Sequence, residues 1–252
     1  MSDLALRITD LTYRYPGHDE LVVNCGSLEL SRGEQMLLTG GSGMGKSTLL
    51  HLISGLLEPA SGRVEVAGEG VHGKRGAKRD LFRGRNIGMI FQTFNLLHGF
   101  SAIENVMAAL MFSSIPRSEH AERARELLDR LGIDRQYAEP DELSVGQQQR
   151  VAVARAVACK PIIVLADEPT ASLDPGNSVK AIELIQRVCG EQEAALLCVS
   201  HDPALVDRFE RRQALAELAP AGSAAGARAR MQSEASEMAQ QRSESARAGA
   251  GS

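Results

Sequence analysis

At residues 40–48 this 252-residue chain carries the sequence Gly40-Gly41-Ser42-Gly43-Met44-Gly45-Lys46-Ser47-Thr48. The sequence matches the phosphate-loop pattern G-x-x-x-x-G-K-[ST]. Three glycines, at 41, 43 and 45, let backbone N–H groups turn inward onto phosphate oxygens, where a Cβ would obstruct the approach. Lys46 supplies a positive charge for the β- and γ-phosphates, and Ser47 offers a hydroxyl to Mg²⁺.

The sequence on either side of the loop supports the same interpretation. Residues 35–39 are predicted to form a buried strand that enters the loop. Residues 47–53 are predicted to form a helix that leaves it, with the helix N-terminus aimed at a bound anion. A chance Gly-rich turn is the alternative. Because strand, loop, Lys-Ser pair and helix occur in this order, the sequence predicts that the chain binds a nucleoside triphosphate.

The composition argues against several other classes of protein. A formal net charge of −4 implies no general affinity for nucleic acid or anionic membranes, and 4% aromatic residues without Trp argue against a base-stacking platform. No apolar run is long enough to cross a bilayer, and the N-terminus lacks the layout of a signal peptide. The four cysteines lie far apart in the sequence with no C-x-x-C pair, so we expect isolated, buried thiols in a reducing compartment. We therefore expect a cytosolic protein.

Strand patterns and helix patterns alternate along the chain, and several strand patterns are apolar throughout. This combination predicts an α/β protein with a largely parallel sheet covered on both faces. The expected strands are two or three antiparallel pieces within 4–30, then 63–68, 86–91, 161–167 and 194–200, and the expected helices are 101–138 with a break at Pro116 and a stop at Gly132, then 147–159, 175–189 and a short one from Pro203.

Three segments lack such patterns. Residues 70–86 contain six Lys and Arg in a Gly-rich sequence, and we expect a solvated surface loop. No terminal strand is evident beyond residue 212. Residues 219–252 are rich in Ala, Gly and Ser and cannot bury enough apolar surface to offset their ordering entropy. We expect a disordered tail there, with at most a weak helix around residues 231–247.

Two carboxylates end the apolar strand predicted at residues 161–167. Asp167 lies at the carboxyl end of that strand, which is the edge where open α/β sheets bind ligands. It is therefore the natural anchor for Mg²⁺ beside Ser47. Glu168, one residue later, points elsewhere and can activate a water against the γ-phosphate. The alternative is a pair of solvated acids at a strand end.

The order of these motifs resembles that of ABC-transporter ATPase subunits over residues 4 to about 212. The motifs that carry the resemblance are the phosphate loop, Gln92 after a strand, the signature Leu143-Ser144-Val145-Gly146-Gln147-Gln148-Gln149-Arg150, Asp167-Glu168-Pro169-Thr170, Ser172-Leu173-Asp174 and His201-Asp202. Within that family, short sequences such as Ser54-Gly55-Leu56 and Glu104-Asn105-Val106 look most like the lipoprotein-releasing, macrolide-exporter and cell-division ATPases.

The resemblance implies an architecture and an activity. It implies a P-loop NTPase (RecA-like) core with a small antiparallel β-subdomain and an inserted helical subdomain at about 93–158, all within a nucleotide-binding domain over 1–218. Two copies would form a homodimer that sandwiches two ATP molecules, with Mg²⁺, head to tail. The dimer would energise export or release of a substrate through separate transmembrane permease subunits, at the cytoplasmic face of the inner membrane. The alternative is an ATP-driven regulatory switch that transports nothing, as in the cell-division relatives.

The resemblance also implies roles for single residues. Tyr15 resembles the aromatic residue that stacks on adenine, with Tyr13 as the alternative. Gln92 resembles the residue that touches Mg²⁺ and the attacking water, where the membrane partner docks. His201 resembles the switch histidine that contacts the γ-phosphate. Glu168 is the expected catalytic carboxylate.

The signature residues Ser144, Gly146 and Gln147 resemble those that close on the γ-phosphate bound by the opposite subunit, and Asp174 resembles a residue that communicates across the dimer. Two departures from the family pattern stand out. Val145 replaces the usual Gly, which would strain the signature if its backbone needed a positive φ. Ala171-Ser172 replaces the Gly-Asn usual in the lipoprotein-releasing subgroup. This difference argues against membership of that subgroup, but not against ATPase activity.

Overall fold

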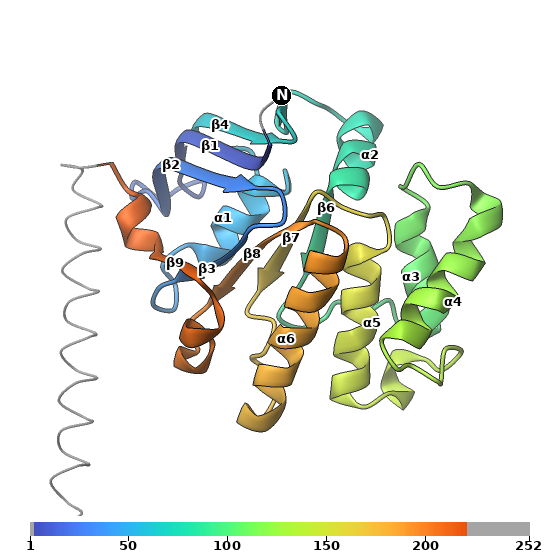
Figure 1. The fold of residues 1–252 in the computed structure, drawn as a ribbon. Coiled ribbons are helices and arrows are strands. Elements are labelled where there is room, and N and C mark those ends of the chain that lie inside the picture. The colour runs from blue at the N-terminus through green and yellow to red at the C-terminus, as the bar shows by residue number, and fades with distance from the viewer. Residues whose placement is uncertain (1–2, 221–252) are drawn as a thin grey trace, which may run out of the picture.

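The computed structural model describes residues 3–220, so most of the tail expected at residues 219–252 lies outside the described residues. Two β-sheets enclose the helix that follows the phosphate loop (Figure 1). That helix, α1 (Lys46–Ile53), buries Leu49, Leu50, Leu52 and Ile53 in a core shared with both sheets. The loop at its N-terminus is thereby attached to a rigid support.

The first sheet is antiparallel and has the strand order β2-β1-β4-β5. Its strands are β1 (Leu4–Tyr13), β2 (Val23–Ser31), β4 (Ser61–Val66) and the short β5 (Glu69–Gly70). Leu6 pairs with Leu30 on one side and with Val66 on the other, and alternate side chains of β1 are buried against α1. The small antiparallel subdomain expected from residues 4–30 and 63–68 is therefore present, with two strands in the first segment.

The second sheet is parallel and has the strand order β6-β7-β8-β3-β9. Its strands are β6 (Ile87–Ile90), β7 (Ile163–Asp167), β8 (Ala195–Ser200), β3 (Gln35–Thr39) and β9 (Arg211–Ala214). Successive residues of the central strands face opposite cores, so that Leu196 packs towards the outer helices and Leu197 towards α1. Burial on both faces explains why β7 and β8 are apolar throughout.

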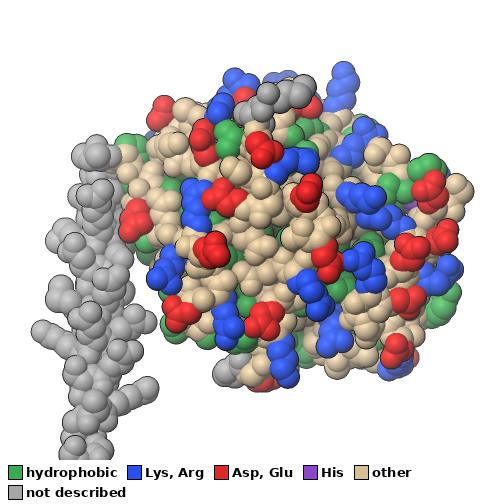
Figure 2. All heavy atoms as spheres, viewed as in Figure 1, with side chains coloured by type: hydrophobic (Ala, Val, Ile, Leu, Met, Phe, Trp, Pro, Cys, Tyr) green, Lys and Arg blue, Asp and Glu red, His purple; other side chains and the backbone are tan. Residues whose placement is uncertain are grey.

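Two helices, α5 (Val145–Val157) and α6 (Pro175–Glu191), cover the outer face of the parallel sheet (Figure 1). Helices α3 (Ala102–Leu110) and α4 (His120–Arg130) pack against α5 on its side away from α6, while α2 (Ala77–Asn86) lies at the start of β6. Short 3₁₀ turns occupy Arg117–Glu119, Pro140–Glu142, Pro203–Arg208 and Leu215–Leu218. The capping box expected at Ser101 and Glu104 is formed. Acidic and basic side chains are interspersed on the face shown in Figure 2.

Three predictions of secondary structure were wrong. Residues 77–86 form α2 rather than a loop, because Phe82 is buried and Gly84 lies against Phe112 while the charged residues point outward. Residues 133–138 are not helical: Gln136 and Ala138 accept hydrogen bonds at their carbonyls from the first N–H groups of α3. Strand β9 was missed because its sequence, Arg211-Arg212-Gln213-Ala214, is polar and lies at the sheet edge.

Candidate active site

The phosphate loop connects β3 to α1 at the carboxyl edge of the parallel sheet, where β7 and β8 also end. Thr39 pairs with Ser200, and Asp167 pairs with Val199, so the last residues of these three strands lie side by side. Within the loop, Gly45 has a φ of 90°, and a Cβ built on it would lie 2.4 Å from the carbonyl oxygen of Val22. Only glycine fits there.

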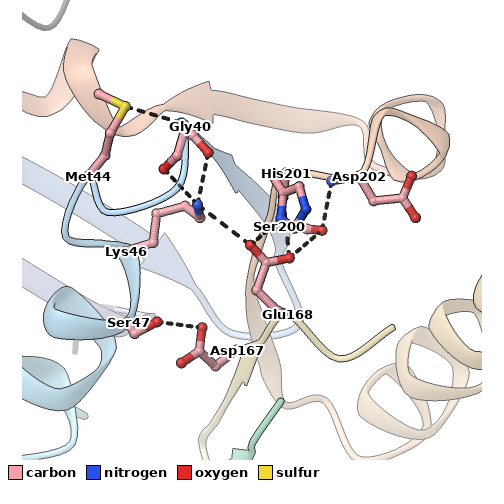
Figure 3. A network of polar contacts seen from close by, with 10 residues as sticks. Gly40, Met44, Lys46, Ser47, Asp167, Glu168, Ser200, His201 and Asp202 are labelled. Atoms are coloured by element: carbon pink, nitrogen blue, oxygen red, sulfur yellow. Dashed lines mark hydrogen bonds and ion pairs between the residues drawn. The ribbon is translucent and has the colours of Figure 1, made fainter. Parts of the chain in front are cut away.

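Lys46 is buried and its ammonium group turns back into the loop (Figure 3). Its Nζ donates to the carbonyl oxygens of Gly40 at 2.8 Å and Gly41 at 3.0 Å. It also lies 3.5 Å from Oε1 of Glu168, with which it forms an ion pair. The loop lysine and the expected catalytic carboxylate therefore lie in one connected network, a contact that the sequence did not predict.

Ser47 and Asp167 form the expected pair at the start of α1 and the end of β7. Ser47 Oγ donates to Asp167 Oδ1 at 2.9 Å, and burial raises the pKa of Asp167 above its ordinary value. A hydroxyl and a carboxylate are hard oxygen donors, which suit Mg²⁺. Within residues 3–220 no group of three His, Cys, Asp or Glu could hold a metal. Mg²⁺ usually takes one or two carboxylates and completes its shell with substrate phosphates and water, so Ser47 and Asp167 suit it as a pair.

Glu168 follows with a left-handed backbone, at a φ of 45°, and its N–H donates to the carbonyl oxygen of Val199 at 3.0 Å. This conformation turns the side chain away from Asp167 and towards the end of β8. Its Oε2 accepts from Ser200 Oγ at 3.0 Å and from the His201 N–H at 3.3 Å. Its Oε1 lies 2.8 Å from His201 Nδ1, which carries the proton of this bond because a carboxylate only accepts.

These contacts keep Glu168 ionised. Burial opposes the charged form, but the hydrogen bonds from His201 and Ser200, with the charges of His201 and Lys46, outweigh it and lower the pKa of Glu168 below its ordinary value. Ser200 was not singled out from the sequence, although its position between a buried strand and His201 was a usable signal. Sequence reasoning thus found the carboxylate and the histidine but missed the hydroxyl that holds them.

Tyr15 lies beside the loop and Tyr13 does not present its ring to solvent. The Tyr15 side chain is 39% exposed, whereas Tyr13 is 8% exposed. The two rings meet edge to face with centroids 5.1 Å apart, and Tyr15 Oη shares a hydrogen bond of 3.0 Å with Thr48 Oγ1. Of the two candidates for contact with adenine, only Tyr15 has an accessible ring next to the loop.

Gln92 follows β6, as expected, but its exposed side chain makes no hydrogen bond with Ser47 or Asp167 in the described part of the chain. Its carbonyl oxygen accepts from Ser172 Oγ at 3.4 Å.

Arg155 of α5 holds the residues that follow Gln92. Its two terminal nitrogens each lie 2.6 Å from a carbonyl oxygen, one of Phe94 and one of Asn95. No sequence signal pointed to Arg155, because its partners lie 60 residues away.

The signature begins α5 with regular geometry. Ser144 is the N-cap, its Oγ accepts from the Gln147 N–H at 3.3 Å, and Gln147 Oε1 accepts from the Ser144 N–H at 3.0 Å. Val145 is the first helical residue and has no positive φ. The strain considered for Val at this position is therefore absent.

The signature lies on a different surface from the phosphate loop. Ser144, Val145, Gly146 and Gln147 line a groove of about 1100 Å³ together with Ser172, Leu173 and Asp174. No residue of the phosphate loop lines this groove. Asp174 is exposed and caps α6 through the Asn177 N–H. Within one copy of the chain, the groove that the signature lines therefore receives no residue from the phosphate loop.

Comparisons with known proteins agree with this geometry. A family model described as ABC transporter matches residues 23–171. The Hydrogenovibrio crunogenus protein named lipoprotein-releasing system ATP-binding protein LolD is 39% identical over 220 residues, which cover 86% of this chain and 96% of the relative. The chain belongs to the ABC transporter family. The Nitrobacter hamburgensis protein of the same name is 43% identical over 202 residues, covering 79% of this chain and 87% of that relative.

A solved structure gives the same result for the fold. The dimeric post-hydrolysis structure of the ATP-binding cassette MJ0796, bound to ADP and Pi, has a TM-score of 0.74 and 32% identity, and covers 83% of this chain and 93% of that chain. The predicted P-loop NTPase fold and ATPase activity are confirmed: this member of the family binds and hydrolyses ATP. In residues 3–220, no helix has both the length and the apolar character needed to span a membrane.

Proposed function

We propose that this chain energises the export or release of a substrate, with lipoproteins as the candidate, from the inner membrane through separate transmembrane permease subunits. The observation that carries this proposal is the similarity to the two relatives named for lipoprotein release, at 39% identity over 86% of the chain and at 43% identity over 79% of it. On this proposal the chain binds at the cytoplasmic face of the inner membrane as a peripheral subunit.

The working form is a head-to-tail homodimer. We expect a second copy to supply Ser144 and Gly146 to a triphosphate held by residues 40–48, because within one copy the signature lines a groove to which no phosphate-loop residue contributes. The N-terminus of α5, with the positive end of its helix dipole, is suited to close on the γ-phosphate bound by the opposite copy. The dimeric state named for the MJ0796 structure supports the same arrangement.

ATP binding uses the loop N–H groups, the N-terminus of α1 and Lys46, which together offer positive charge to the β- and γ-phosphates. The accessible ring of Tyr15 stacks on adenine. Ser47 and Asp167 would hold Mg²⁺, with Gln92 as a further candidate ligand, and the ion would neutralise charge on the phosphate oxygens. The Lys46 ammonium group donates two of its three N–H groups to the carbonyl oxygens of Gly40 and Gly41, and a phosphate would share this group with them.

Hydrolysis is an in-line attack of water on the γ-phosphorus. The new bond joins the water oxygen to phosphorus while the bond between phosphorus and the β,γ-bridging oxygen breaks, releasing ADP and phosphate. Glu168, kept ionised by its neighbours, orients the water and accepts its proton. His201 lies against Glu168 and fixes its direction, in a position to contact the γ-phosphate.

The catalytic proposal is tested by steady-state ATP hydrolysis at increasing protein concentration, with Glu168→Gln alongside. We expect the rate per subunit to rise with concentration in the wild type, and we expect Glu168→Gln to bind ATP but to accumulate as a dimer without turnover. Lys46→Ala is the matched control and should lose tight ATP binding. A Glu168→Gln variant with normal turnover would refute the role of the carboxylate.

The transport proposal needs a separate experiment in cells. Depletion of this chain should cause newly made lipoproteins to remain in the inner membrane, and re-expression of the wild type but not of Glu168→Gln should restore their release. If depleted cells release lipoproteins normally while the purified chain hydrolyses ATP as expected, lipoproteins are not the substrate. The regulatory-switch alternative would then be tested next.

A further inference from the structure

The side chain of Met44 folds back across the first two glycines of the phosphate loop (Figure 3). The Gly41 N–H donates to Met44 Sδ at a distance of 3.1 Å. A Cβ built on Gly40 or Gly41 would lie 3.7 Å or 3.4 Å from that sulfur, so the thioether packs directly on their backbone. The glycines therefore leave room for a side chain of the loop itself, as well as for a ligand.

Lys46 engages the same two glycines through their other polar groups. Its Nζ donates to both of their carbonyl oxygens, at 2.8 and 3.0 Å, and it is paired with Glu168 at 3.5 Å. The 40–41 segment is thus held on both sides, its N–H at Gly41 by the thioether and its carbonyls by the ammonium group. Met44, Lys46 and Glu168 fix one conformation of the loop.

A phosphate that accepts from the Gly41 N–H competes for it with the thioether, and a phosphate that contacts Lys46 shares the ammonium group with the two carbonyl oxygens. The thioether is suited to being displaced, because sulfur is a weak acceptor and the unbranched side chain has three rotatable bonds. Met44 is also only partly buried, so that it can swing out without opening the core. The phosphate-loop pattern accepts any residue at position 44, so the motif itself does not require this contact.

We infer that Met44 is an internal competitor that lowers the affinity of the loop for nucleotide. The inference rests on the proposed use of residues 40–48 as the nucleotide site, and adds a specific determinant of its affinity. The loss of one hydrogen bond of ordinary net strength corresponds to about a two- to tenfold change in Kd. Removing the sulfur should therefore tighten nucleotide binding by about that factor.

The test is calorimetric titration of the full chain with ADP and Mg²⁺, since ADP occupies the loop without being hydrolysed. Met44→Leu keeps most of the apolar volume and removes the acceptor, and Met44→Ala removes both. We expect both variants to bind ADP about two- to tenfold more tightly than the wild type. Met111→Leu, at an exposed methionine of α3's C-terminal end, is the matched control and should bind as the wild type does.

A second measurement reports the contact itself. In Met44→Leu without nucleotide, the Gly41 amide hydrogen should exchange faster with solvent, by NMR, than in the wild type. Unchanged or weaker ADP binding in both folded variants would overturn the inference, whether or not the amide exchange changes. Failure of the wild type to bind ADP would instead reject the proposed nucleotide site, which keeps the two failures distinct.

Discussion

Arg155 should be essential for the structure of the segment that follows Gln92. The guanidinium of Arg155 donates to the carbonyl oxygens of Phe94 and Asn95 at 2.6 Å each, in the forked geometry that suits this side chain. Both acceptor residues have left-handed backbones, with φ values of 57° and 48°. Phe94 is buried in the core formed by the helices, so a change in the backbone conformation of this segment would also disturb the packing of the Phe94 side chain.

The size of the effect follows from these contacts. Two hydrogen bonds from a charged donor contribute about 3–6 kcal/mol together. Once they are removed, the segment can relax, and relief of the left-handed conformation at Phe94 returns about 1–3 kcal/mol. Asn tolerates that conformation, so Asn95 adds little. Subtracting the returned energy from the lost energy leaves about 2–3 kcal/mol, so we expect Arg155→Met to lower the free energy of unfolding by about that amount.

Equilibrium unfolding in urea measures this loss, and hydrogen exchange of the 92–97 segment locates it. Arg155→Lys is the control, because lysine keeps the charge but lacks the planar fork, and it should recover only part of the stability. The slope of the unfolding free energy against urea should not change, since the same surface becomes exposed. A loss below about 1 kcal/mol, with unchanged exchange at 92–97, would refute the reasoning.

Three further predictions concern the loop, the signature and the thiols. Gly45→Ala should lose more stability than Gly43→Ala, because both positions have a positive φ but only the Cβ at 45 meets the Val22 carbonyl; thermal unfolding with and without ADP compares them. Val145→Gly should leave ATP hydrolysis within about a factor of two, since the Val145 backbone is helical, and a tenfold gain would show that the side chain obstructs closure. Burial raises the pKa of Cys159 to about 11, so this thiol should react slowly with a thiol reagent at pH 8, yet before the three buried cysteines.

The parts of the site that the sequence predicted are those encoded by neighbouring residues. Glycine spacing, the Lys46-Ser47 pair and an acidic pair after four aliphatic residues are all local, and the structure places Ser47 against Asp167 as expected. Apolar strands were found for the same reason, because burial on both faces leaves a continuous signal. The signature helix was found from its sequence as well, beginning two residues earlier than expected.

The parts that the sequence did not predict depend on contacts between distant residues. Strand β9 is polar, and only its pairing with β3 defines it. Helix α2 is rich in charge and is fixed by one buried phenylalanine and by Gly84 against Phe112. The orientation of Glu168 depends on Ser200, 32 residues later in the chain. Neither composition nor periodicity contains such information, because each element is stabilised mainly by its partner.

Helix α5 joins the signature to both segments that flank the expected γ-phosphate position. Ser144 caps its N-terminus, and the buried amide of Gln149 donates to the carbonyl of Pro169 at 2.8 Å, next to Glu168. Arg155, near its other end, holds the residues that follow Gln92. Because these hydrogen bonds are direct and the helix is rigid, a displacement of the signature by a second copy would move both segments together. In the proposed head-to-tail dimer, the helix that would close on the opposite nucleotide would thereby reposition Glu168 and Gln92 around the nucleotide of its own copy.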